Sequence, residues 1–553
     1  MTNADEIAAA IKKMLVTDLF VEVGADEMGL DQSLRDAFGL DSLGFVELRV
    51  QCENVFGVRI SDEEFNPENF TSIRAVTELI HQQLTANTGQ GDGLDDRVPE
   101  ADLDVLRFER RVRLDHYGGH ALPFAALGSS GLVQRFVELA GPAAGRGFDV
   151  IDASGGYGSA CLGAAHEVVK AALDRAVDEV GYATDETGSA ERAHLLWELF
   201  GEGGLWADRF PAEQYHVSGR NSGSEGVELA MRLVLESRFD GRKLAPREGK
   251  AQRDTVLAFE GAWHGWSGGL LPLLNKRHYR VGLPAPASGE PYGIRVEHIP
   301  FGDATALREF FETEGERLLA VVVEPVQGDA GVLVPPEGYL REISTLCRHS
   351  GALLVADEVL TFAKTGRFFA MTDADGPIPT DITVLGKSLG MGVLSTSMVI
   401  ALRDLTVRAS GAVATSDLRP LTCAVIRDGL RYITSERLLE RSAAVGRTLS
   451  GLLADELVAQ FPDLYRRSDG AGYLHGVELT EEASWHLGRL RECLVRAGVY
   501  VEYMSGAGQR SRGLSYVYPT MRVAPPLIAT EDDVVTVVER LREGSTAFRK
   551  ASL

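Results

Sequence analysis

Two different hydrophobic patterns divide the chain. In the first ninety residues, apolar side chains recur at the three- and four-residue spacing of helices. One such set runs from Ile7 to Leu19, a second from Leu43 to Phe56, and a third lies near Ile73–Leu84. This spacing predicts a small bundle of helices at the start of the chain.

After about residue 145 the apolar positions form short continuous runs instead. Leu319–Val323 and Ala352–Ala356 are typical of strands buried on both faces, as in parallel sheets. Helical stretches such as Val227–Leu235 and Tyr339–Cys347 separate such runs. The pattern predicts an α/β domain with a mainly parallel sheet, in which functional residues gather at the carboxyl ends of the strands.

A polar, Gly-rich stretch without periodicity separates the two regions and predicts a linker. A flexible chain of about 20 residues spans on the order of 25 Å. The domains expected are therefore a helical bundle over 1–85, a linker over 86–105, a large domain over 106–425 and a small C-terminal α/β subdomain over 426–553.

Composition narrows the range of partners. The chain has 44% hydrophobic and 25% charged residues, as in ordinary globular proteins. Its formal net charge is −24, which argues against nucleic acid or an anionic membrane as the main partner. The five cysteines form no CxxC pair, so neither a disulfide framework nor a metal site is expected. With no signal peptide and no apolar run long enough for a bilayer, the expected location is cytoplasmic.

The helical bundle carries much of the acidity, and Ser42 marks the start of its second helix. Residues 1–90 hold 16 acidic and 6 basic side chains. Taken alone, Ser42 is an ordinary helix N-cap. The segment nevertheless resembles an acyl or peptidyl carrier protein, with the signature Asp41-Ser42-Leu43 after the first helix and loop. The resemblance implies a four-helix bundle, 4′-phosphopantetheine on Ser42, and acidic side chains such as Glu47 that face basic partner enzymes.

Lys387 follows the apolar run Ile382–Leu385 and Gly386 directly. A lysine at the end of a buried strand is costly unless it is paired or used. Such a site lowers the pKa of the amine and makes it a nucleophile toward carbonyl groups. The competing interpretation, a lysine that extends to solvent at a strand end, is slightly favoured when this stretch is taken alone.

Three further motifs stand at predicted strand ends. Asp357 follows Ala352–Ala356 and suits either an ordinary strand-end carboxylate or a partner for a protonated heterocyclic nitrogen. Asn221–Gly226 leads into a helix and offers N–H groups and hydroxyls that bind phosphate, or simply caps the helix. Trp263-His264-Gly265 offers a ring that stacks on a planar cofactor, although a core tryptophan and a structural histidine are the plainer interpretations.

Together the motifs provide a carbonyl-trapping amine, a pyridinium partner, a phosphate cup and a stacking ring, which is the outline of a pyridoxal phosphate site. Residues from about 145 onward resemble class III aminotransferases, the group that includes glutamate-1-semialdehyde aminomutase. The motifs that carry the resemblance are Asn221-Ser222-Gly223-Ser224-Glu225, Trp263-His264-Gly265, Glu324-Pro325-Val326-Gln327-Gly328, Asp357-Glu358-Val359, Gly386-Lys387 and Arg522-Val523-Ala524-Pro525-Pro526-Leu527.

The resemblance implies a fold type I homodimer with active sites at the subunit interface. Lys387 would bind pyridoxal 5′-phosphate as a Schiff base and move the proton between carbons, and Asp357 would keep the pyridine nitrogen protonated. Thr415 matches a threonine that reaches the phosphate of the partner subunit. The other implied contacts are with the phosphate from Ser222, Gly223 and Ser224, with the ring faces from Trp263 and Val359, and with substrate from Arg522 and His264. For Arg522, a solvated arginine near a Pro-Pro turn is the alternative.

Some positions depart from the family. Ser416–Pro420 replaces an aromatic residue followed by a Gly-Asn-Pro run, Phe362 follows Thr361 where the family has glycine, and no proline lies near His166. These departures concern substrate identity and the interface rather than the cofactor core.

A carrier joined to an amine-transfer enzyme suggests a tethered substrate. The expected activity moves an amino group from an amino-acid donor to a keto or aldehyde acyl group on the enzyme's own carrier, as in polyketide or nonribosomal peptide biosynthesis. The expected partners are the donor, a phosphopantetheinyl transferase and other assembly-line enzymes. An intramolecular aminomutase, and a docking protein with an inactive pyridoxal domain, remain as alternatives.

Overall fold

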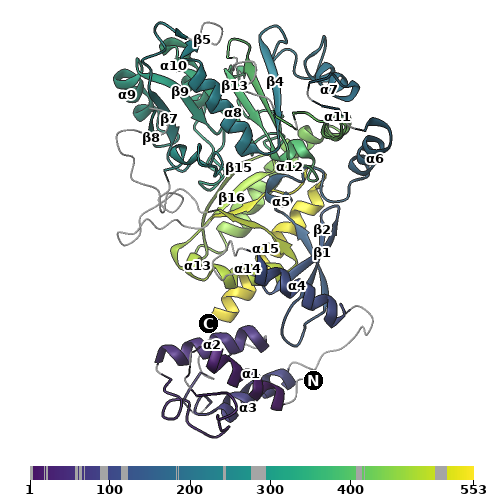
Figure 1. Ribbon diagram of the computed structural model, residues 1–553, viewed down its shortest axis with the longest axis vertical. Coiled ribbons are helices and arrows are strands. Elements are labelled where there is room, and N and C mark those ends of the chain that lie inside the picture. The colour runs from purple at the N-terminus through teal and green to yellow at the C-terminus, as the bar shows by residue number, and fades with distance from the viewer. Residues whose placement is uncertain are drawn as a thin grey trace. The chain divides into compact units, whose positions relative to one another are not determined.

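The computed structural model describes residues 4–17, 19, 21, 23–40, 42–56, 60, 65–67, 69–86, 97–113, 122–181, 183–184, 186–240, 245–275, 294–405, 414–415, 417–504 and 520–552. The chain separates into two compact units, residues 1–128 with 135–149, and residues 129–134 with 150–553. Figure 1 labels their helices and strands. Within the described residues, no helix combines the length and the apolar character that crossing a membrane requires.

The first unit begins with the helices α1 (Ala4–Thr17), α2 (Ser42–Phe56) and α3 (Ile73–Ala86). Their apolar faces form one core, because the helical spacing places those side chains on the same side of each helix. Residues 57–59 and 61–64 lie outside the described residues, so a fourth helix stays a prediction. The most deeply buried members of this core are Ile7, Ile11, Leu15, Leu34, Leu48, Cys52, Ile60, Ile73, Val76 and Ile80.

Helix α4 (Glu100–Val112) begins inside the range assigned to a linker, so regular structure starts earlier than composition predicts. Pro99 precedes it and Glu100 and Asp102 lie in its first turn, which favours a helix start. Leu103 of α4 packs with Val137 and Leu139. Three strands follow α4 in the chain: β1 (Phe124–Ser130), β2 (Val133–Glu138) and β3 (Gly147–Asp152).

A seven-stranded mixed sheet is the centre of the second unit, in the order β4-β14-β13-β10-β9-β7-β8. The strands from β13 to β8 run parallel to one another, and β14 is antiparallel to both of its neighbours. The mainly parallel sheet expected from the sequence is therefore present. Its strands are β4 (Tyr215–Arg220), β7 (Thr255–Phe259), β8 (Arg295–Ile299), β9 (Leu318–Val323), β10 (Leu353–Glu358), β13 (Ile382–Leu385) and β14 (Ser397–Leu402).

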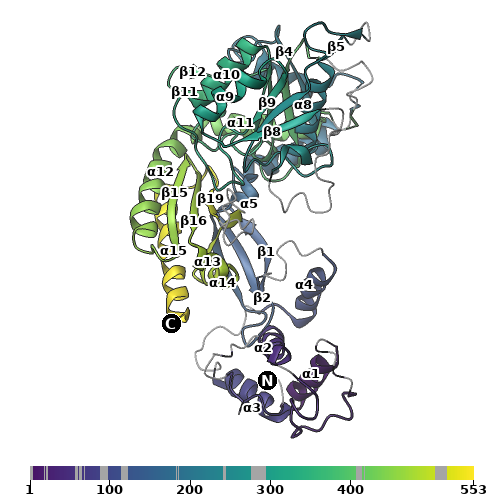
Figure 2. The same cartoon turned by 90° about the vertical axis from the view of Figure 1, so that its left-hand side faces the viewer.

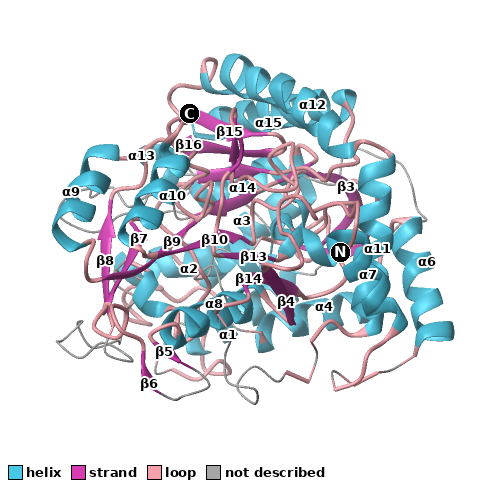
Figure 3. Cartoon of the chain, turned by 90° about the horizontal axis from the view of Figure 1, so that it is seen from above, coloured by secondary structure: helices cyan, strands magenta, loops and turns pink. Residues whose placement is uncertain are grey.

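Helices cover both faces of this sheet (Figure 3). Alternate residues of β10 face opposite ways: Val355 packs with α8 (Gly223–Glu236), whereas Leu354 packs with α9 (Ala304–Glu314) and α10 (Tyr339–Ser350). This double burial explains why the strands are apolar runs without alternation.

A second, antiparallel sheet has the order β15-β16-β19-β18, and its core residues Val477 and Met521 are fully buried. Helices α12 and α15 lie beside β15 and β16 in Figure 2. These strands and helices are β15 (Tyr465–Ala471), β16 (Leu474–Leu479), β18 (Glu502–Met504), β19 (Thr520–Val523), α12 (Leu438–Leu452), α13 (Glu481–Trp485), α14 (Leu487–Arg496) and α15 (Glu531–Ser552). The other α-helices and strands are α5 (Gly155–Gly158), α6 (Glu167–Arg175), α7 (Ala190–Phe200), α11 (Pro420–Ser435), β5 (Phe239–Asp240), β6 (Ala245–Pro246), β11 (Thr372–Asp373), β12 (Gly376–Pro377) and β17 (Val499–Tyr500), which pairs with the end of β3.

Truncation of a central strand residue tests this packing. We expect Leu354→Ala to lower the free energy of unfolding by about 2–5 kcal/mol, because the cavity that it leaves in β10 cannot be filled by its neighbours. Leu205→Ala is the matched control, since Leu205 is exposed, and its effect should stay within about 0.5 kcal/mol. Denaturant unfolding followed by tryptophan fluorescence measures both, and equal losses would contradict the arrangement.

Candidate active site

Three neighbouring parallel strands end at one edge of the large sheet and carry Glu324, Asp357 and Lys387 there. The register pairs Ala356 with Val323 and Glu358 with Leu385. Glu324 therefore follows the end of β9, Asp357 is the penultimate residue of β10, and Lys387 comes two residues after β13. The two most specific residues of the sequence analysis, Asp357 and Lys387, lie at the same sheet edge.

Lys387 begins a short 3-10 helix (Lys387–Gly390) and has a φ of +44°, a left-handed conformation that is uncommon outside glycine. Its side chain is half-buried. Burial and the positive charge of Arg522 lower the pKa of Lys387 to about 8, against the opposing effects of Glu502, Asp357 and Glu324. Near neutral pH an appreciable fraction of this amine is therefore unprotonated, as a carbonyl-trapping group requires.

Asp357 is buried and shares its side-chain hydrogen bonds between a loop amide and a histidine. Its Oδ1 accepts from Val359 N at 3.1 Å, and its Oδ2 lies 2.8 Å from His264 Nδ1. Burial lowers the pKa of His264, but the hydrogen bond and the charges of Asp357 and Glu324 outweigh it and raise that pKa overall. His264 thus holds the carboxylate of Asp357 in place through Nδ1. Its buried Nε2 has no hydrogen-bond partner among the described residues, and its contact with substrate stays a prediction.

Glu324 holds two loops together at the sheet edge. Its Oε2 accepts from Trp263 N at 2.9 Å, and its Oε1 accepts from Gly328 N at 3.3 Å. Burial raises the pKa of Glu324 to about 7, an effect that His264 opposes and Asp357 reinforces. The loop that carries Trp263 and His264 is thus fixed beside Asp357.

Ser222, Gly223 and Ser224 form the start of α8. Ser222 caps the helix, because its Oγ accepts from Glu225 N at 3.2 Å. No described residue accepts a hydrogen bond from the backbone N–H of Gly223 or Ser224. Ser224 Oγ lies against Gly265, where a β-carbon would collide with it. The phosphate cup and the Trp263–Gly265 loop are therefore in direct contact.

Val359 connects the phosphate cup to the lysine. A β-carbon at Gly223 would lie 2.6 Å from Val359 Cγ1, and one at Gly386 would lie 3.1 Å from the same atom. Glycine is needed at position 223 because the valine side chain occupies the space that a larger residue would need.

Arg522 lies on β19 of the antiparallel sheet and is buried in an ion pair with Glu502, the residue opposite it on β18. Glu502 also accepts from the backbone N–H of Tyr157. The alternative of a solvated arginine near the Pro-Pro turn is wrong, because the side chain is only 2% exposed. Since Arg522 lowers the pKa of Lys387, the two cations are neighbours.

Two further residues were expected at the site from the sequence. Thr415 is exposed, and its carbonyl oxygen accepts from Arg419 at 3.3 Å. Ser42 is the first residue of α2 in the other unit. Its side chain lies outside the described residues, as does Asp41.

Glu502, Asp152 and Lys364 were not predicted from the sequence. All three are buried, and they come from the second sheet, from the end of β3 and from the loop after β10. A signal existed for Lys364 alone, because it follows the apolar pair Phe362-Ala363 seven residues after Asp357.

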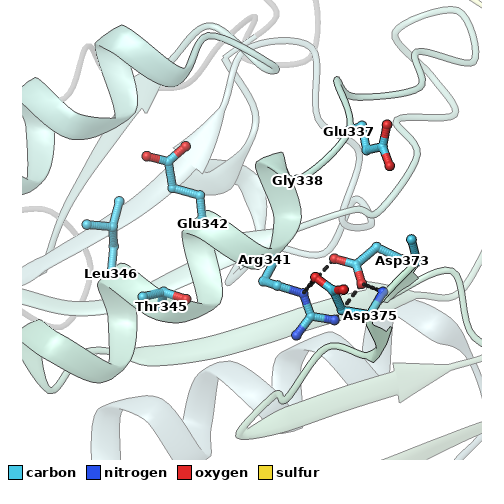
Figure 4. A pocket seen from close by; sticks show the side chains of 9 residues that line it. Glu337, Gly338, Arg341, Glu342, Thr345, Leu346, Asp373 and Asp375 are labelled. Carbon is cyan, nitrogen blue, oxygen red and sulfur yellow. Dashed lines mark hydrogen bonds and ion pairs between the residues drawn. The ribbon is translucent and has the colours of Figure 1, made fainter.

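One surface pocket of about 370 Å³ lies at the start of α10 and has none of these residues in its wall (Figure 4). Arg341 within it is bound to Asp373, with Asp375 at 4.0 Å. Its acidic lining does not suit a phosphate.

Both parts of the chain match profiles of known protein families. The profile described as "Aminotransferase class-III" matches residues 144–544. The chain belongs to the class III aminotransferase family. The profile described as "Phosphopantetheine attachment site" matches residues 15–80, so the chain joins a carrier domain to a class III aminotransferase domain.

Curated relatives of the class III domain include ornithine aminotransferases. The mitochondrial enzyme of Oryza sativa subsp. japonica is 33% identical over 266 residues, which cover 48% of this chain and 53% of the relative. The Bacillus cereus (strain Q1) enzyme is 30% identical over 58% of this chain and 73% of its own length. The chain thus spans only between about half and three quarters of the curated relatives that it matches.

Solved structures share the fold. An ornithine aminotransferase from Toxoplasma gondii superposes with a TM-score of 0.66 at 24% identity, over 83% of this chain and 97% of the other. An omega-transaminase from Thermomicrobium roseum gives a TM-score of 0.65 at 22% identity, over 82% and 100%.

The family membership implies pyridoxal 5′-phosphate and 4′-phosphopantetheine as cofactors, and the class III site residues fit the former. The unpartnered amides of Gly223 and Ser224 at a helix N-terminus suit a phosphate. Lys387 provides a partly exposed amine of lowered pKa, and Asp357 provides a carboxylate fixed by His264. The buried Nε2 of His264 is a further polar atom that faces no described partner.

A substitution at Gly223 tests whether the start of α8 binds the phosphate of the cofactor. We expect Gly223→Ala to weaken binding of pyridoxal phosphate by about tenfold or more, because the new methyl group displaces Val359 or the start of α8. Retention of the cofactor after dialysis, read from its absorbance, measures this. Gly268→Ala is the control, since no atom lies within 4 Å of its β-carbon position; equal retention by the two variants would contradict the packing described.

The raised pKa of Glu324 predicts a pH effect on stability. Between the ordinary value of 4.5 and about 7 the folded state holds a proton that the unfolded state has lost. The contribution of Glu324 to the free energy of unfolding is therefore fully present below pH 4.5 and is lost as the pH rises to about 7. The free energy of unfolding falls by at most about 3 kcal/mol over this range. Glu324→Gln should lack this loss, so its stability relative to the native protein should increase from pH 5 to pH 7.

Urea unfolding of the cofactor-free protein at several pH values measures that difference. Glu337→Gln, at an exposed position, is the control and should follow the native protein. Parallel pH profiles for Glu324→Gln and the native protein would show that Glu324 does not carry the proton.

Proposed function

We propose that the chain is a pyridoxal phosphate-dependent aminotransferase that moves an amino group from an amino-acid donor to a keto or aldehyde acyl group. The acyl group is held as a thioester on the phosphopantetheine arm of the enzyme's own carrier, at Ser42. The observation that carries the proposal is the presence, in one chain, of a phosphopantetheine attachment domain and a class III aminotransferase domain. Such a fusion suits biosynthesis of the polyketide or nonribosomal peptide type.

The cofactor, when bound, supplies a ring that stabilises negative charge on the carbon next to the transferred nitrogen. Lys387 takes up and returns the proton at that carbon, for which a pKa of about 8 is suited. Asp357 pairs with the ring nitrogen, and His264 and the Val359 amide keep the carboxylate oriented. The amides of Gly223 and Ser224 hold the phosphate.

The tether changes the kinetics of the second substrate. Because the carrier and the aminotransferase domain belong to one chain, capture of the acyl group is intramolecular and no longer depends on the bulk concentration. The acyl thioester has no free carboxylate, whereas the amino-acid donor has one. Arg522 therefore serves the donor in this proposal.

We further propose a homodimer in which Thr415 of each subunit reaches the phosphate site of the other. Its exposure in the single chain is compatible with that role. A phosphopantetheinyl transferase and other assembly-line enzymes are the expected partners of the carrier domain.

The test uses the full chain with Ser42 phosphopantetheinylated and loaded with a β-keto acyl group. With an amino-acid donor that carries isotope-labelled nitrogen, the acyl group should become a labelled β-amino acyl group, detected by mass spectrometry of the carrier. Lys387→Ala should abolish the conversion, because the amine that binds the cofactor and moves the proton is lost. Ser42→Ala should prevent loading.

The label separates the competing functions. Labelled product requires transfer from the donor, whereas an amine shift within an amino-bearing acyl group without any donor would establish an aminomutase. If the loaded carrier keeps its carbonyl while free small ketones are aminated, the tethered substrate is wrong.

A further inference from the structure

Lys364 is a second lysine near Lys387 and, unlike Lys387, is fully buried and has no assigned role. It lies in the loop after β10 and is 3% exposed. Its ammonium group makes neither a hydrogen bond nor an ion pair with any of the described residues. A buried cation without a partner is strongly unfavourable, so a site that retains one is suited to an anion that arrives from outside.

The nearby acids are already engaged. Glu502 is bound to Arg522 and to the amide of Tyr157. Asp152 Oδ1 accepts from Ser154 N at 2.8 Å, from Ser154 Oγ at 2.7 Å and from Gly155 N at 3.1 Å. Burial raises the pKa of Cys161 to about 11, so its thiol is neutral and provides no counter-charge.

Gly158 lies between Lys364 and Ser388, the residue that follows Lys387 in the chain. A β-carbon at Gly158 would lie 2.8 Å from Lys364 Cε and 3.4 Å from Lys364 Nζ. The carbonyl oxygen of the same Gly158 accepts from Ser388 Oγ at 3.3 Å, and Ser388 is the residue after Lys387. Arg522 and Glu502 also act on the pKa values of both lysines. The ion pair therefore lies near Lys364 as well as near Lys387.

We infer that the ammonium group of Lys364 binds the carboxylate of the amino-acid donor, beside Arg522. The inference rests on the proposed transfer from an amino acid and names the group that selects the donor. A phosphate is the poorer fit: the cofactor phosphate has its own cup at Gly223 and Ser224, and the phosphate of the carrier arm is separated from the thioester by the whole arm.

The pKa of Lys364 is sensitive to the charges around its ammonium group. Burial lowers its pKa to about 8, an effect that Arg522 strengthens and that Glu502 and Asp152 oppose. A bound carboxylate would favour the charged form. Because the acyl thioester carries no carboxylate, Lys364 would distinguish the donor from the tethered acceptor.

Propionate and propanamide are matched probes, since they differ in the charge of the acid group. Calorimetric titration of the cofactor-loaded full chain should show that propionate binds more tightly than propanamide. Lys364→Met should weaken propionate binding by about tenfold or more, the usual contribution of a charge-assisted hydrogen bond, and should leave propanamide unchanged. Lys364→Arg should retain propionate binding, and Lys170→Met, at an exposed position, should match the native protein.

A kinetic arm uses L-alanine and isopropylamine, in which a methyl group replaces the carboxylate. Lys364→Met should raise the KM for L-alanine with little change in kcat. The KM for isopropylamine should stay unchanged. The same substitution should also raise thermal stability, because it removes an unpaired buried charge. The inference fails if the Lys364→Met variant binds propionate as tightly as the native protein does, or if its affinities for propionate and propanamide fall equally. It also fails if the variant unfolds at a lower temperature than the native protein. Because propionate binding needs no acyl carrier, failure of tethered transfer would leave this result standing, and the reverse also holds.

Discussion

The register of three parallel strands is the constraint on which the site depends. β9, β10 and β13 end at the same edge of the sheet. Glu324, Asp357 and Lys387, which are far apart in the chain, therefore lie close together at that edge. Water is largely excluded there, and the pKa of Lys387 and that of Glu324 both move to within about one unit of neutrality. The apolar runs that make the strands thus also create the electrostatic environment in which the polar residues act.

Much of this arrangement could be predicted because it follows from local sequence. An apolar run that ends in a charged residue, as at Asp357 and Lys387, indicates a strand end whatever the rest of the chain does. A Ser-Gly-Ser sequence before a helical pattern indicates a helix N-terminus in the same way. The roles that depend on tertiary packing were less accessible. Nothing in the sequence around His264 indicates its hydrogen bond to Asp357, and nothing around Glu502 marks it as the buried partner of Arg522.

The departures from the family have structural explanations that sequence patterns do not contain. Phe362 is fully buried among Trp206, Phe368 and Phe369, so the residue after Thr361 belongs to the core rather than to a flexible turn. Asp417, in the altered segment after Thr415, accepts from Ser218 Oγ at 2.8 Å and also from the Gly219 amide. It therefore secures the end of β4, just before the phosphate cup. Helix α4, by contrast, was missed because the polar composition before it obscured where the linker stops.

The residues proposed to hold the cofactor are 222–224, 357 and 387, and the buried arginine near them is residue 522. These positions span some three hundred residues, and the last lies on a different sheet from the others. A chain still emerging from the ribosome therefore cannot assemble the pocket until its final quarter is available. Cofactor capture then becomes a late event that stabilises only molecules in which both sheets have formed.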